Sequence, residues 1–233
     1  MFYIIMVVIF IASFAIQGRL KSLVSKYSKI KTASGITANE AVEQMLEQNE
    51  VFGVVVKHTD GELSDNYNSK EGTINLSDTT YGSDSIAAVA IAAHEAGHAL
   101  QDSQGMAAYK ARQAVAPVVN FCSQAGVYVT IAGVLVSYFV EKTVGSGIGY
   151  TISTIGIVMY SIAVLFYAVT LWIERDASKR GWKAMQQNGW VSQEQLAAAK
   201  KLLWAAGDTY AIALASSAAT LLRLLAMRGG RRR

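Results

Sequence analysis

Two of the chain's three histidines, His94 and His98, stand four residues apart, with Glu95 between them. Side chains at positions i and i+4 of an α-helix lie on one face, so both imidazoles can reach a single metal ion. The pattern H-E-x-x-H is typical of sites in which the two histidines bind zinc and the glutamate acts as a general base. The sequence therefore predicts His94 and His98 as zinc ligands and Glu95 as the catalytic base.

The segment that carries this motif favours a buried helix from about Ser85 to Gln101. Residues 85–93 are rich in alanine and other apolar side chains and contain neither glycine nor proline. Ser83 or Asp84 is the expected N-cap. Because polar side chains buried without partners are costly, a bound metal would explain the imidazoles. The alternative is a pair of structural histidines that happen to have this spacing.

A catalytic zinc site usually has three protein ligands, so a third ligand must come from outside the motif. His58 is the remaining histidine, but Glu174 is the stronger candidate. It follows the second of two apolar runs, and a hairpin of these runs would return it to the depth of the motif helix. Asp176 lies about 200° around the helix from Glu174, so the two carboxylates are not expected to share an ion. Alternatively, Glu174 and Arg175 only mark the polar end of an apolar run.

The composition indicates membrane segments. Only 16% of the residues are charged, against about 25% in soluble domains. Uncharged, mostly apolar runs cover residues 1–16, 114–140 and 150–173, and the last two exceed the roughly 20 residues that span a bilayer. The single cysteine, Cys122, excludes a disulfide framework, and nothing resembles a nucleic-acid-binding module.

The charge pattern predicts an orientation in the cell membrane. Residues 1–17 are interpreted as an N-terminal anchor rather than a cleaved signal peptide, since no basic region precedes them. Basic residues follow the anchor and flank both ends of the hairpin at 114–173, which places the motif on the cytoplasmic side of a multi-pass protein. Residues 209–227 are expected to pack on the domain or the membrane surface, because a fourth crossing would leave the C-terminal arginines outside.

Between the anchor and the motif, a capping box at Thr37–Glu40 predicts a helix that reaches Gln48. Residues 51–56, 63–67 and 72–76 then favour three strands. The expected fold is a mainly α membrane protein with a zincin-like helical metalloprotease core, a small antiparallel β-sheet and an inserted transmembrane helical hairpin. Its expected parts are an anchor (1–17), a cytoplasmic zincin-like region (18–113), the hairpin (114–173) and a C-terminal helical part of the catalytic domain (174–233).

Two motifs together carry a resemblance: H-E-x-G-H-A-x-Q at 94–101 and E-x-D-A-S at 174–178. This combination resembles the YugP-type membrane zinc metallopeptidases over nearly the whole chain, and more distantly the HtpX-type gluzincin peptidases. In the HtpX type a glutamate in an E-x-x-A-D-like segment is the third zinc ligand, so the resemblance implies that role for Glu174. The chain departs from these families at residues 65–69, which read D-N-Y-N-S instead of D-H-Y-D-P, and at Ser178, where an aspartate is expected.

The predicted function is a membrane-bound zinc endopeptidase that acts on a peptide or protein substrate, with Zn²⁺ as cofactor and the lipid bilayer as its setting. Gln101 or Asp102 could support a ligand histidine. The alternatives are a non-catalytic zinc-containing scaffold, which would not need Glu95, and a metal-free scaffold or transporter, which the absence of charges within the apolar runs disfavours. A homo-oligomer or an accessory membrane partner is possible. Candidate donors to the reaction's oxyanion are His58, Asn66, Tyr67, Tyr81 and Tyr210.

Overall fold

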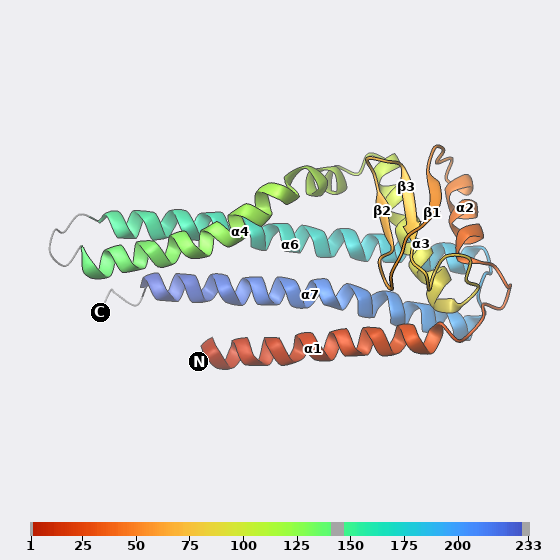
Figure 1. Cartoon of the computed structure of the whole chain (residues 1–233), viewed down its shortest axis with the longest axis horizontal. Helices are drawn as coiled ribbons and strands as arrows, with labels where there is room; N and C mark the ends of the chain where they lie inside the picture. The colour runs from red at the N-terminus through yellow and green to blue at the C-terminus, as the bar shows by residue number, and fades with distance from the viewer. Residues whose placement is uncertain (1, 141–146, 230–233) are drawn as a thin grey trace. The chain divides into compact units, whose positions relative to one another are not determined.

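The computed structural model describes residues 2–140 and 147–229. The chain is mainly α-helical with a small three-stranded sheet (Figure 1). In chain order its elements are α1 (Phe2–Tyr27), α2 (Ala38–Gln48), β1 (Val55–His58), β2 (Asn66–Asn68), β3 (Thr73–Leu76), α3 (Ile86–Ser103), α4 (Ala107–Phe139), α6 (Ile148–Gln187) and α7 (Gln193–Gly229).

Contacts within the chain divide it into two compact units, and the long helices are shared between them. One unit, here called the motif unit, is formed by Phe14–Lys110 and Trp172–Thr209. The other, here called the membrane unit, contains the described residues of Met1–Ser13, Ala111–Leu171 and Tyr210–Arg233. The motif unit holds the sheet, α2, α3 and the segment around Glu174, so it contains every predicted metal ligand.

The two short helices of the motif unit begin at side-chain caps. The predicted capping box of α2 is confirmed, because Thr37 Oγ1 accepts from the Glu40 N–H and Glu40 Oε2 accepts from the Thr37 N–H. In α3 the N-cap is Ser85, whose Oγ accepts from the backbone of the first turn, so the prediction of Ser83 or Asp84 is wrong. The Asp84 carboxylate instead binds Lys31 Nζ at 2.8 Å.

The sheet is mixed, not antiparallel as the sequence suggested. Its strand order is β1-β3-β2, with β2 antiparallel and β1 parallel to β3. The segment 59–65 carries the chain past the position of β3, so β2 pairs with the following strand and not with the preceding one. This order leaves β1 and β2 as the two edges, and β2 is the edge that contacts α3.

Two glycines allow α3 and α6 to approach until their backbones touch. A Cβ atom on Gly97 would lie 2.7 Å from the carbonyl oxygen of Ala177, and one on Gly181 would lie 2.8 Å from that of Ala93. Both distances are shorter than real Cβ contacts, so only glycine fits at these positions. The glycine within the motif is therefore a packing residue that brings the α6 segment 174–181 against the motif.

We expect Gly97→Ala to destabilise the chain by about 1–3 kcal/mol, because overpacking of a tight contact forces the backbones apart. Thermal unfolding of the purified chain in detergent would measure the loss. The matched control is Gly18→Ala in α1, where no atom lies within 4 Å of an added Cβ. Equal unfolding temperatures for the two variants would contradict the proposed role of Gly97.

In the membrane unit, α4 and α6 pack against each other through two glycines on each helix, spaced seven residues apart. These are Gly126 and Gly133 on α4 and Gly149 and Gly156 on α6. A Cβ on Gly126 would lie 2.8 Å from the carbonyl oxygen of Gly156. Small residues at such crossings let helix backbones approach in lipid, where packing drives association. The connection at 141–146 lies outside the described residues.

Residues 209–227 lie in the C-terminal part of α7. Its C-terminal half packs on α6 through Leu224, and Arg228 donates to Thr154 Oγ1 at 3.1 Å and lies 5.1 Å from the centre of the Tyr150 ring. Because Tyr150 and Thr154 are at the start of α6, the C-terminal part of α7 reaches that end of α6, an arrangement that a fourth membrane crossing would also give. Four helices, α1, α4, α6 and α7, are long and apolar enough to cross a membrane.

Candidate metal centre and active site

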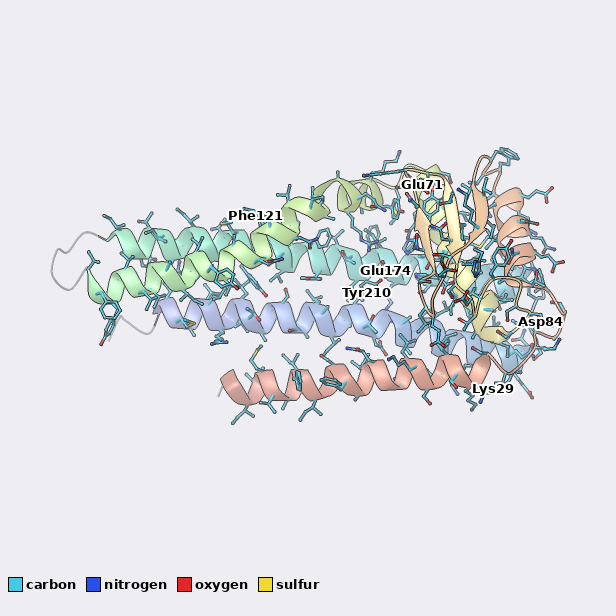
Figure 2. All side chains as sticks on the ribbon, viewed as in Figure 1. Lys29, Glu71, Asp84, Phe121, Glu174 and Tyr210 are labelled. Carbon is cyan, nitrogen blue, oxygen red and sulfur yellow. The ribbon has the colours of Figure 1, made fainter. Side chains whose placement is uncertain are left out.

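Three side chains from two helices converge on one point in the motif unit. Glu174 Oε2 of α6 lies 3.3 Å from His94 Nε2 and 3.4 Å from His98 Nε2 of α3. Figure 2 labels Glu174 on α6. The three ligand atoms lie within 4.8 Å of one another. Glu174 and His98 are buried, and His94 is partly open, with 17% of its side chain exposed. The structure thus brings together all three predicted metal ligands.

The other ring nitrogen of each histidine has a partner of its own. His94 Nδ1 lies 3.1 Å from Ser178 Oγ, and His98 Nδ1 lies 2.9 Å from Gln101 Oε1. Since an amide oxygen only accepts, His98 donates from Nδ1 to Gln101, and its Nε2 is the nitrogen that faces Glu174. These contacts fix the ring orientations in the way that outer partners of metal-binding histidines do.

Gln101 is itself held firmly. Its side chain is fully buried, and its Nε2 donates to the Ile173 carbonyl and to Asp176 Oδ2, each at 2.9 Å. Because both of these partners are acceptors, the amide can only present its oxygen to His98. Asp176 in turn accepts from Arg180 Nε at 2.6 Å. Asp176 therefore belongs to this supporting network and not to the three converging ligand atoms.

Glu95 is buried on the side of α3 that meets the edge strand β2. Its Oε2 accepts a hydrogen bond of 2.9 Å from the backbone N–H of Tyr67. The Tyr67 side chain extends the contact, since its hydroxyl donates to Asp102 Oδ2 at 3.0 Å. Burial and this bond to Asp102 raise the pKa of Tyr67 well above its ordinary value. Tyr67 thus binds α3 through both its backbone N–H and its hydroxyl, and the backbone bond orients the Glu95 carboxylate.

The remaining candidates lie in different places. His58 is bound to Asp78 at 2.7 Å in an exposed group that also contains Asp60, and its ring contacts Tyr81. Asn66 Oδ1 accepts from Asn75 within the sheet. Tyr210 belongs to the membrane unit.

Sequence reasoning missed the contacts made by Ser178 and by the Tyr67 backbone. The position of Ser178, four residues after Glu174 and so on the same helix face, could have pointed to it. No sequence pattern identifies the backbone N–H of Tyr67.

Residues 2–229 match the model of a protein family described as "Putative neutral zinc metallopeptidase". The chain belongs to this family. It is 32% identical over 213 residues to the "Putative membrane protease YugP" of Bacillus subtilis (strain 168), a match that covers 91% of this chain and 90% of that protein. No solved structure matches the chain.

The donor set fits the metal that the zinc metallopeptidase family name implies. Two imidazoles and a carboxylate are typical catalytic zinc ligands, and bonds of about 2.0–2.2 Å in a tetrahedron separate ligand atoms by about 3.3–3.6 Å. The observed separations of 3.3 and 3.4 Å agree with this value. Both are longer than the roughly 2.7–2.9 Å of a charge-assisted hydrogen bond, so these two distances are compatible with binding to one ion.

We expect Gln101→Leu to weaken zinc binding by about 10–100-fold, because it removes the acceptor that orients His98. Titration against a chelator of known affinity measures the change. Gln104→Leu is the matched control, since the exposed side chain of Gln104 accepts from Arg180 and, among the hydrogen bonds of the described residues, contacts neither histidine. If both variants bind zinc as tightly as the native chain, Gln101 does not position His98.

Proposed function

We propose that this chain is a membrane-bound zinc-dependent endopeptidase in which His94, His98 and Glu174 hold the metal and Glu95 is the general base. The observation that carries the proposal is the convergence of the two Nε2 atoms and Glu174 Oε2 at 3.3 and 3.4 Å, beside a buried glutamate with no role as a ligand. Membership of the zinc metallopeptidase family supports the reaction class.

The roles of the protein groups follow from their positions. When bound, zinc supplies a Lewis acid that activates water and polarises the scissile carbonyl. Glu95 takes a proton from the attacking water and delivers it to the leaving amine. The Tyr67 N–H holds the Glu95 carboxylate in place, and Ser178 and Gln101 hold the two imidazoles. The substrate class is a peptide or protein chain, since the reaction needs a scissile amide.

The experiment that tests this proposal is metal removal from the purified chain in detergent, with a casein-like protein as substrate. Hydrolysis should stop after treatment with a zinc chelator and return when zinc is added back in stoichiometric amount. A chain that contains zinc but never cleaves protein would favour the alternative of a non-catalytic zinc scaffold. A chain that cleaves equally well without metal would reject the proposal.

We also propose that the motif unit faces the cytoplasm, on the basis of the basic residues that follow the anchor and flank the hairpin. Since α7 follows the hairpin to the start of α6, we expect reporters fused after Phe139 and after Gly229 to report the outer side and one fused after Gln104 to report the cytoplasm. Opposite sides for the first two fusions would refute the fourth crossing.

A further inference from the structure

A groove separates α2 from β1, on the edge of the sheet that faces away from Glu95. It has a volume of about 540 Å³. Its lining consists of four residues of α2, the segment 51–56 and Tyr81; the four from α2 are Asn39, Glu43, Leu46 and Glu47. This volume falls within the range of about 300–1,000 Å³ of ordinary ligand pockets. In Figure 1, β1 lies at the sheet edge beside α2.

The backbone of β1 can accept another strand on this side. The Val55 N–H donates to the Gly72 carbonyl and the Thr59 N–H donates to the Leu76 carbonyl, both at 2.9 Å, so these groups point to β3. Hydrogen-bonding groups alternate in direction along a strand, so the N–H and C=O of Val56 and His58 point to the open edge. Within residues 2–140 and 147–229, no backbone partner is found for either residue on that side. An exposed strand edge of this kind is where extended peptides add by main-chain hydrogen bonds.

The side chains around the groove specify the kind of peptide. Phe52 and Val55 are 81% and 55% exposed, so the strand side of the groove presents apolar side chains to a ligand. Glu43 and Glu47 stand one turn apart on α2, and both are exposed. The lining contains no lysine or arginine, although the chain as a whole has a net charge of +4. The groove is therefore apolar on the strand side and acidic on the helix side.

We propose that this groove is a docking site for an extended segment of a partner polypeptide with alternating basic and apolar side chains, which adds to β1 as a fourth strand. Alternate side chains of an extended chain point to opposite sides. One set would contact Phe52 and Val55, and the other would reach Glu43 and Glu47. The site is distinct from the edge at β2, where Tyr67 contacts Glu95, and its binding does not depend on hydrolysis.

The test is the binding of a fluorescent nine-residue probe of alternating lysine and valine to the full chain in neutral detergent, measured by anisotropy. The chain carries Glu95→Gln so that the probe is not consumed. We expect saturable binding that is lost for a glutamate–valine probe and for a lysine–valine probe with N-methylated peptide bonds. The N-methylated probe tests strand addition without any change to the protein.

Charge reversal provides the matched comparison. The double variant Glu43→Lys, Glu47→Lys should weaken probe binding at least tenfold. The control double variant Glu62→Lys, Glu71→Lys makes the same change in charge outside the lining, and its affinity for the probe should stay within twofold of the native value. Figure 2 labels Glu71 in the turn after β2. The proposal is overturned if the lysine–valine probe does not bind the chain. It is also overturned if both double variants bind this probe equally well, or if the N-methylated probe binds as tightly as the unmodified one. A self-associated chain that the first double variant dissociates would also overturn it, in favour of a second copy as occupant.

Discussion

Replacing Glu174 by alanine is expected to reduce the zinc content of the purified chain from about one ion per chain to near zero. The side chain is one of the three proposed ligands, and the two imidazoles that remain come from a single helix. The variant should also lose hydrolysis. Elemental analysis after dialysis against a weak chelator measures the metal directly, without reference to activity.

The matched control for this experiment is Glu194→Ala. Glu194 is an exposed glutamate in the first turn of α7 and should leave the zinc content unchanged. Full zinc occupancy in Glu174→Ala would mean that the third ligand lies elsewhere. His58→Ala in the same background would then test the other histidine, which the structure places in an exposed group with Asp60 and Asp78.

Replacing Glu95 by glutamine is expected to lower the rate of protein hydrolysis by about 10²–10⁴-fold, the contribution usual for a general base. Zinc content should stay at the native level, because Glu95 is not among the three converging ligands. The amide oxygen can still accept from the Tyr67 N–H, so the packing of β2 on α3 should be kept. Initial rates on a labelled casein-like protein, together with metal analysis, check both expectations.

The control for Glu95→Gln is Glu71→Gln, the same change at an exposed turn, which should leave the rate unaltered. A native rate in Glu95→Gln would reject Glu95 as the base even if zinc is present. Loss of both zinc and rate would instead mean that Glu95 supports the metal site. The two glutamate variants therefore separate ligand from base: Glu174→Ala should lose the metal, and Glu95→Gln should keep it.

Local patterns predicted the features that depend on one helix at a time. The i, i+4 spacing puts His94 and His98 on one face of α3 regardless of the rest of the chain, and the capping box marks the start of α2. Apolar length alone indicated the helices that can span a membrane. For residues 209–227 the charge rule and the packing point to different placements: the rule keeps the C-terminal arginines inside, whereas Arg228 contacts Thr154 and Tyr150 at the start of α6.

The motif helix, the apolar spans and the types of residue available as ligands follow from the sequence alone, because they depend on neighbours along one helix. The contact of Glu174 with the two histidines depends on the folded chain, since it needs Gly97 against Ala177, 80 positions apart along the chain (177 − 97). The tertiary structure also determines that Gln101 and Ser178 hold the rings and that the Tyr67 N–H holds Glu95. Contacts between distant segments depend on how closely backbones pack, and no local pattern encodes that distance.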